Sequence, residues 1–337
     1  MTTKPVAVGT LSQLASRPEA GSFVGMIAVY VFFALMGGAN FIGAPGISSV
    51  LNMSSEVGII ALSVGLLMIA GQLDMSVGAI VPASSLTVSL LAVDFGVPDV
   101  IAILGGLTMG LAIGFVNGIL VSRTRIPSLI ITIGTMFGVM GLTLGLTVLI
   151  HGSTGVFLVP GDAAKAIFGQ LISNMFQVSI LWWGVFVAAI YWLLHVSPLG
   201  NWIFALGGDK ESARNAGIPT VKLTIGLYML SGFSAAFVGV SQVMTFNAAQ
   251  VAAGQTFIFN SIMCVVIGGV LLTGGAGSVL GIVLGTLTFC IVNQGIFFSG
   301  LDPNYGSIII GALLLIAVMT NDKFRAMALA LSAGRRA

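Results

Sequence analysis

The sequence predicts an all-α, polytopic membrane protein with about ten transmembrane helices, and its composition is the first reason. Of 337 residues, 57% are hydrophobic and only 7% are charged, whereas soluble domains average about 25% charged residues. The 12 Lys and Arg with the 10 Asp and Glu cannot cover the surface of a soluble protein of this size, so much of the surface must face lipid. The net charge of +2 argues against a nucleic-acid partner.

Long uncharged stretches are the second reason. A helix needs about 20 mainly apolar residues to cross the hydrocarbon core, and turns, prolines and polar loops divide the chain into ten such segments. A turn at Gly43-Ala-Pro-Gly46 is expected between the first two. The third segment is either a span or a re-entrant helix. The expected spans are residues 23–40, 50–70, 77–93, 100–121, 128–150, 179–194, three between residues 222 and 302 divided near residues 247–255 and 273–277, and 305–320.

The basic residues predict the orientation of these spans. Lys and Arg near span ends gather on the cytoplasmic side, and cytoplasmic N- and C-termini place only Lys165 outside. Residues 1–22 and 321–337 are then cytoplasmic tails, and residues 23–320 form one transmembrane domain. The residues placed inside are Lys4, Arg17, Arg123, Arg125, Lys210, Arg214, Lys222, Lys323, Arg325, Arg335 and Arg336.

Several glycines recur at intervals of four residues within the expected spans. This spacing puts them on one helix face, which favours close helix packing. It indicates packing rather than catalysis. The runs are Gly106, Gly110 and Gly114; Gly134 and Gly138; Gly141 and Gly145; and Gly281 and Gly285.

Enzyme chemistry finds little support in the sequence. His151 and His195 are expected near opposite membrane faces, so neither a two-His metal site nor a His-supported triad can assemble. Cys264 and Cys290 lie in apolar stretches, where a free cysteine behaves as a small hydrophobic residue. No lysine stands in a GxxxxGK[ST] run, so any ATP and Mg²⁺ must be bound by another chain. We therefore expect neither an enzyme nor a metal site or cofactor in this chain.

Polar residues in or beside the spans are candidates for a solute path or gate. Nearly all charges lie at span ends, and Asp74 is the most suggestive acid: it either caps the helix that follows or takes part in the path. The uncharged candidates either line a path or hydrogen-bond between helices. They are Gln72, Asn117, Gln242, Asn247, Asn260 and Asn293.

The loop at about residues 197–223 has a clear internal design. Asp209 is a suitable N-cap for a short helix over residues 210–216, Gly217 can end that helix, and Pro219 blocks its continuation. A short capped helix between two spans suits docking on a soluble partner. An ordinary amphipathic connector is the other interpretation.

Three separated segments resemble a known transporter family. They are Ile69-Ala-Gly-Gln-Leu-Asp-Met-Ser-Val-Gly78, the loop Ala205-Leu-Gly-Gly-Asp-Lys-Glu-Ser-Ala-Arg-Asn-Ala-Gly-Ile218, and Val266-Ile-Gly-Gly-Val-Leu-Leu-Thr-Gly-Gly-Ala-Gly-Ser-Val-Leu-Gly281. These are similar to a Gly-Gly-Ile-Asp-Leu-Ser-Val-Gly pattern, a coupling helix and a glycine-rich segment in the permeases of ribose-type ABC importers. That family also serves other sugars and is distantly related to branched-chain amino acid permeases. Gln72 departs from it where a second glycine is usual, and Asp209 where Asn is common.

The resemblance implies a division of labour in a bacterial inner membrane. Two permease chains, identical or different, would enclose the path, cytoplasmic ATPases would bind ATP and grip the coupling loops, and a periplasmic binding protein would deliver a sugar or similar solute. The main rival is a secondary carrier driven by an ion gradient. The residues implied in coupling are Ala205, Gly207, Gly208, Asp209, Glu211, Ala213, Arg214, Ala216 and Gly217.

Overall fold

The computed structural model describes residues 18–300 and residues 302, 305, 306, 308, 311 and 312. Residues 1–17, most of the expected tenth span and the C-terminal tail with its four basic residues lie outside the described part. The first helix begins at Pro18, inside the stretch expected to be a tail.

Long apolar helices build the described part of the chain. Seven helices are long and apolar enough to cross a membrane, and α8 continues through a π-helical turn to Val196. They are α2 (Pro18–Ile42), α3 (Ala44–Ile69), α5 (Asp99–Arg123), α6 (Ser128–His151), α8 (Ser179–Tyr191), α11 (Thr220–Phe246) and α13 (Val279–Phe298). The fold is thus an all-α polytopic membrane protein, as predicted.

Two shorter apolar helices complete the set. They are α4 (Val77–Val93), whose bounds are those predicted for the third span, and α12 (Gln255–Ile267), which follows the 3₁₀ turn η2 (Val251–Gly254). The 17 residues of α4 are at the lower limit for a full crossing, and the 13 residues of α12 are fewer than one requires. The total of ten spans stays a prediction, because most of residues 305–320 lie outside the described part.

The break expected between the first two spans is shorter than predicted. Helix α2 ends at Ile42 and α3 already starts at Ala44, with Pro45 in its first turn. A proline in the first helical turn costs no hydrogen bond, because the N–H groups there have no partner in the helix. Pro45 therefore begins a helix where the sequence analysis expected a turn.

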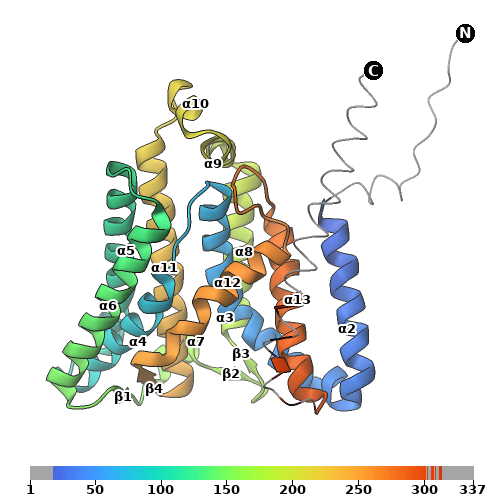
Figure 1. Cartoon of the computed structure of the whole chain (residues 1–337). Coiled ribbons are helices and arrows are strands. Elements are labelled where there is room, and N and C mark those ends of the chain that lie inside the picture. Colours follow the sequence, from blue (N-terminus) through green and yellow to red (C-terminus); the bar gives the residue numbers. More distant parts are fainter. Residues whose placement is uncertain (1–17, 301, 303–304, 307, 309–310, 313–337) are drawn as a thin grey trace, which may run out of the picture.

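Short elements cover the two ends of the helical bundle. At one end lie α9 (Pro198–Gly208) and α10 (Lys210–Asn215), and at the other lie α7 (Asp162–Phe168) and the small strands (Figure 1). Each strand pair is antiparallel. The pairs are β1 (Gly155–Phe157) with β4 (Ala248–Gln250), and β2 (Leu171–Ile172) with β3 (Phe176–Gln177).

Helix α3 lies at the centre of the fold. It packs against α8, α11, α12 and α13, and 78% of its most apolar 18-residue window is buried. By contrast, only 6% of the corresponding window of α2 and of α6 is buried, so these two helices form the periphery of the described chain.

The glycine faces divide into two classes. Gly110 and Gly114 pack on α11, and Gly281 and Gly285 pack on α12, as the four-residue spacing predicts. The prediction is wrong within this chain for α6, because four of its glycines have no neighbouring atom within 4 Å of a Cβ position. Spacing identifies a smooth helix face but not whether the same chain covers it. The uncovered glycines are Gly134, Gly138, Gly141 and Gly145.

Candidate functional site

The three family-like segments meet at one place, beside the end of the bundle that carries α9 and α10. The N–H group of Gly275 donates a hydrogen bond to the carbonyl oxygen of Ile69 at 2.8 Å. A Cβ on Gly207 would overlap that same carbonyl oxygen and lie 2.7 Å from the nitrogen of Gly275. A Cβ on Gly274 would lie 2.8 Å from the Cα of Gly71. We call Gly71, Gly207, Gly274 and Gly275 the glycine junction.

Backbone conformation and close approach explain why glycine occupies these positions. Gly71, Gly274 and Gly275 have φ angles of +73°, +85° and +77°, in the left-handed region that favours glycine. Gly207 lies in α9 with ordinary helical geometry, and close contact is what excludes a side chain there. At Gly207 the end of α9 therefore approaches the segments after α3 and α12 backbone to backbone.

The buried side chain of Asp74 anchors the loop between α3 and α4 through hydrogen bonds. Its carboxyl group is fully buried and accepts hydrogen bonds from the N–H of Ser76 at 2.9 Å, the hydroxyl of Ser76 at 2.6 Å and the hydroxyl of Ser231 at 2.8 Å. The amide of Asn117 donates to the hydroxyl oxygen of Ser76 at 2.8 Å. One carboxyl group thereby connects the loop with α5 and α11.

The interpretation of Asp74 as an N-cap needs correction. Ser76 is the N-cap residue of α4, and its carbonyl oxygen accepts hydrogen bonds from Ala79 and Ile80. Asp74 stands two residues earlier and bonds the N–H of Ser76, which forms a turn before the helix. The carboxyl group thus stabilises the approach to α4 rather than its first turn.

Further hydrogen bonds tie the same loop to its surroundings. The hydroxyl of Tyr228 donates to the carbonyl oxygen of Leu73 at 2.9 Å, and the N–H of Leu73 donates to the hydroxyl of Ser128 at 3.1 Å. The N–H of Met75 donates to the hydroxyl of Thr132 at 3.2 Å. The loop is therefore joined to α11 and α6 as well as to α9.

The short helix α10 confirms the predicted loop design. Asp209 accepts a hydrogen bond from the N–H of Ser212 at 2.6 Å, and Gly217 adopts a left-handed φ of +84° after the helix. Hydrogen bonds from the Ser212 side chain and backbone lower the pKa of Asp209. The cap is consequently ionised at neutral pH. The helix ends at Asn215, one residue before the predicted end.

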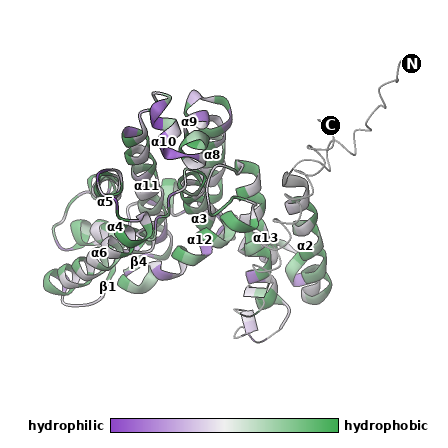
Figure 2. Cartoon of the chain, turned by 45° about the horizontal axis from the view of Figure 1, so that its top comes forward, coloured by the Kyte–Doolittle hydropathy of each residue, from purple (hydrophilic) through white to green (hydrophobic). Residues whose placement is uncertain are grey.

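Most of the predicted coupling residues are exposed on the surface of the chain. Gly208, Asp209, Glu211, Arg214, Ala216 and Gly217 are exposed, Ala205 and Gly207 are half-buried, and Ala213 is buried. The hydrophilic character of α10 stands out at this end of the bundle (Figure 2). A charged, exposed and well-capped helix thus adjoins the glycine junction through the end of α9.

The predicted path residues do not form one cluster. Asn117 joins the Asp74 network, Gln72 is half-buried beside it, and Asn260 is half-buried in α12. Asn293 accepts a hydrogen bond from Gln294 at 3.3 Å, and Asn247 ends α11 with a φ of +56°. These residues therefore mark different depths and sides of the bundle.

Sequence reasoning missed Glu56, the partner of Gln242. Glu56 lies at the middle of the 26-residue α3, and its Oε2 accepts a hydrogen bond from the Nε2 of Gln242 at 2.9 Å. The signal was present, since an acid interrupts an otherwise uncharged stretch from Ala20 to Leu73. The statement that charges lie at span ends therefore has an exception at the centre of the fold.

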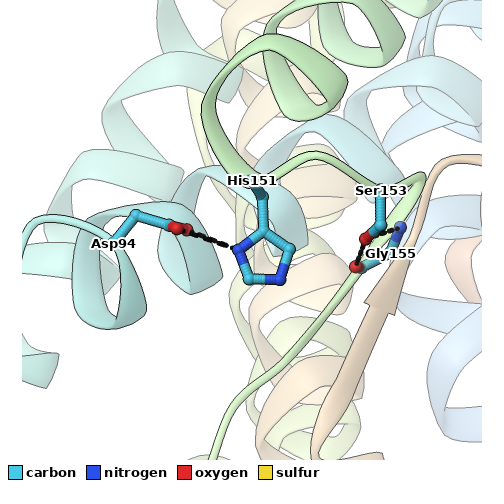
Figure 3. A network of polar contacts seen from close by, with 4 residues as sticks. All are labelled: Asp94, His151, Ser153 and Gly155. Carbon is cyan, nitrogen blue, oxygen red and sulfur yellow. Dashed lines mark hydrogen bonds and ion pairs between the residues drawn. The ribbon is translucent and has the colours of Figure 1, made fainter.

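The histidines do not assemble a metal centre in the described residues. His151 ends α6 and its Nδ1 lies 2.9 Å from Asp94 at the end of α4, near the turn with Ser153 and Gly155 (Figure 3). His195 accepts a hydrogen bond from the N–H of Val279 at 3.3 Å. No group of three or more His, Cys, Asp or Glu side chains in that part of the chain has metal-site geometry.

Comparison with known proteins identifies the family. The family model described as "Branched-chain amino acid transport system / permease component" matches residues 46–318. The fructose import permease protein FrcC of Rhizobium meliloti is 28% identical over 94% of this chain and 88% of its own length. For the ribose import permease protein RbsC of Escherichia coli these values are 30%, 88% and 92%. For the galactose/methyl galactoside import permease protein MglC of Salmonella typhimurium they are 29%, 93% and 96%.

A solved structure, PsaBC from Streptococcus pneumoniae in complex with Fab, matches 90% of this chain and 95% of its own with 17% identity and a TM-score of 0.44. This likeness is too distant to carry an argument. The family model and the three relatives span most or nearly all of the chain, and they confirm its resemblance to sugar import permeases. The chain therefore belongs to the family of branched-chain amino acid transport system permease components, and it is a membrane permease rather than an enzyme.

Proposed function

We propose that this chain is the membrane-spanning permease subunit of an ATP-driven importer that carries a sugar or a related small polar solute into the bacterial cytoplasm. Relatives aligned over nearly the whole chain are named as import permeases for fructose, ribose and galactose, and another is named for autoinducer 2. The observation that carries the proposal is the glycine junction. It joins an exposed docking-sized helix to the loops that lead into α4 and α13.

The proposed partner at α9 and α10 is a cytoplasmic ATP-binding subunit, which would bind ATP and Mg²⁺. The exposed face of α10 offers Lys210, Glu211 and Arg214 for polar contacts. A displacement of α9 would act directly on the Ile69 carbonyl and on Gly275, because backbone atoms touch there without a flexible side chain between them. Coupling requires that the ATPase binds the inward-open and outward-open states with different affinity.

Two further partners complete the proposed importer. A second permease chain, a copy of this one or a related chain, would enclose the solute path. A periplasmic binding protein would deliver the solute and set much of the specificity. Both expectations follow from the resemblance to the permeases of ABC importers, and lipid would surround the remaining apolar surface.

The distribution of charge supports the proposed orientation in the inner membrane, with both termini cytoplasmic. The α5–α6 connection, α9, α10 and the start of α11 lie at one end of the bundle, and α7 lies at the other (Figure 1). The first group contains Arg123, Lys210, Arg214 and Lys222, whereas α7 contains Lys165. This is the asymmetry that the positive-inside rule requires. Residues 23–320 would then form one permease domain with ten spans.

A secondary carrier driven by an ion gradient is the alternative, and Glu56 is an observation in its favour. Acids inside spans often serve ion-coupled carriers as relays or ion ligands. Membership in a transport-system permease family and the exposed α10 favour the ATP-driven mechanism instead.

Uptake into proteoliposomes distinguishes these mechanisms. The chain is reconstituted with the ATPase and binding protein of the same importer, and entry of radiolabelled D-fructose, D-ribose and D-galactose is measured. The importer proposal predicts that uptake requires ATP on the side of the membrane where the ATPase is bound. It also predicts that uptake continues when ionophores collapse proton and sodium gradients. Uptake without the ATPase that ionophores abolish would instead establish the carrier.

A further inference from the structure

Helix α3 is buried along most of its length, with one partly exposed residue in its buried part. From Ser54 to Ile69 every residue of α3 is buried except Glu56, which is half-buried. The same helix packs against α2, α8, α9, α11, α12 and α13. Solvent-accessible space therefore lies against α3 at the position of an acidic side chain, and we call this space the opening.

The hydrogen bonding of Glu56 leaves one acceptor available. Its Oε2 receives the 2.9 Å hydrogen bond from Gln242, which is also half-buried. Within the described part of the chain, Oε1 has no hydrogen-bond partner. It is also absent from the buried side-chain atoms that lack one, so it is accessible from the opening. Glu56 and Gln242 thus expose a carboxyl oxygen next to an amide group.

More polar side chains continue along the same face of α3. Ser49 and Asn52 precede Glu56 by seven and four residues, a spacing that places all three on one helix face. The hydroxyl of Ser49 donates to Gln294 at 2.6 Å, and Asn52 bonds the backbone of Met175 and Gln177 at 2.8 Å each. These two residues are occupied in holding α13 and the β2–β3 hairpin, whereas Glu56 keeps a free oxygen.

An acidic group inside a membrane protein is costly and usually serves function. A purely structural bond between α3 and α11 would need only a neutral amide or hydroxyl. Neighbouring hydroxyl groups of a polyol are recognised by such a pair, because a carboxyl oxygen accepts one hydroxyl hydrogen while an amide both donates and accepts.

We propose that Glu56 and Gln242 form a hydroxyl-binding station for the transported solute inside the membrane, and that they contact a sugar or polyol during its passage. This inference rests on the proposed function, since it names the substrate contact of that importer. The station is a transient site, so the delivery protein still supplies the tight binding. Glu56 Oε1 accepts from one hydroxyl, and the Gln242 amide contacts a second.

Thiol accessibility tests the opening without any assumption about transport. A Glu56→Cys chain in membranes is exposed to a membrane-impermeant maleimide, with Ser63→Cys as the matched control, because Ser63 lies on the same helix and is 1% exposed. The native chain controls for Cys264 and Cys290, both fully buried. We expect Glu56→Cys to react and the controls to remain unlabelled. An unreactive Glu56→Cys in a folded chain would overturn the proposal, and Gln242→Cys replaces it if that chain does not fold.

Uptake kinetics test the contact with solute. In the reconstituted importer, Glu56→Ala removes the accepting oxygen and should raise the KM for the sugar that the native importer carries by about tenfold, the effect of losing one hydrogen bond. The same sugar should slow labelling of Glu56→Cys. Unchanged KM and unchanged labelling together would refute the station. Failure of the native importer to carry D-fructose, D-ribose or D-galactose with ATP would count against the proposed function, and the labelling result would remain valid.

Discussion

Substitution of Gly207 by alanine is the sharpest test of the glycine junction. The new Cβ would overlap the carbonyl oxygen of Ile69 and lie 2.7 Å from the nitrogen of Gly275, inside the 3.0 Å that real Cβ atoms keep. Both neighbours are backbone atoms, so a side-chain rotation cannot relieve the clash. Overpacking of this kind costs roughly 1–3 kcal/mol, and loss of the 2.8 Å hydrogen bond between Gly275 and Ile69 adds about 1 kcal/mol.

Thermal unfolding in detergent and coupled ATP hydrolysis measure the two consequences. We expect Gly207→Ala to lower the Tm of the isolated chain and to reduce the stimulation of ATP hydrolysis by the binding protein, because α9 no longer fits the two loops. Gly208→Ala is the matched control for stability, since no atom lies within 4 Å of its Cβ position. Equal Tm values for both variants would refute the close contact on which the coupling argument depends.

Three further predictions concern Asp74, Asp209 and ATP hydrolysis by the purified chain. Asp74→Ala should destabilise the chain by at least about 2 kcal/mol, because buried donors on Ser76 and Ser231 lose their acceptor. Asp74→Asn keeps one acceptor oxygen and should destabilise the chain less. Equal unfolding temperatures for the two variants would contradict this difference. Asp209→Ala should weaken α10 and lower stimulated ATP hydrolysis, whereas Asp209→Asn keeps a capping oxygen and should retain it. The lowered pKa of Asp209 means that the carboxylate cap is present above the unfolded pKa and lost only as pH falls through the lower folded value. The Asp209→Ala defect should therefore be the same at pH 6 and pH 8, and a defect confined to one of them would count against the cap. The purified chain alone should hydrolyse no ATP, and activity in a homogeneous sample would disprove the division of labour.

Local patterns in the sequence predicted the helices closely. The bounds of α4 and the design of α10 followed from apolar length, capping residues and turn residues, all of which act within a few positions. Pro45 was misjudged because proline both ends helices and begins them. The α6 glycines have no partner helix within the described chain, which their spacing could not predict, because spacing does not reveal which helix, if any, lies opposite.

Contacts between residues far apart in the sequence could not be predicted from local patterns. Ile69, Gly207 and Gly275 belong to three segments whose glycines each have a local explanation as turns or caps, and only the fold brings their backbones together. Glu56 was visible as an acid in an apolar stretch, but its burial, its pairing with Gln242 and its free oxygen depend on how α11 packs on α3.

Reconstitution of the complete importer tests the central claim most directly. The chain is purified in mild detergent with the ATPase of the same importer and placed in lipid. ATP hydrolysis is then measured with and without the periplasmic binding protein loaded with sugar. The account predicts a stable complex whose hydrolysis rises with the loaded binding protein and loses that response when Glu211 on α10 is replaced by lysine. A chain that binds no ATPase would contradict this account. So would a complex whose rate of ATP hydrolysis changes neither with the loaded binding protein nor with Glu211→Lys.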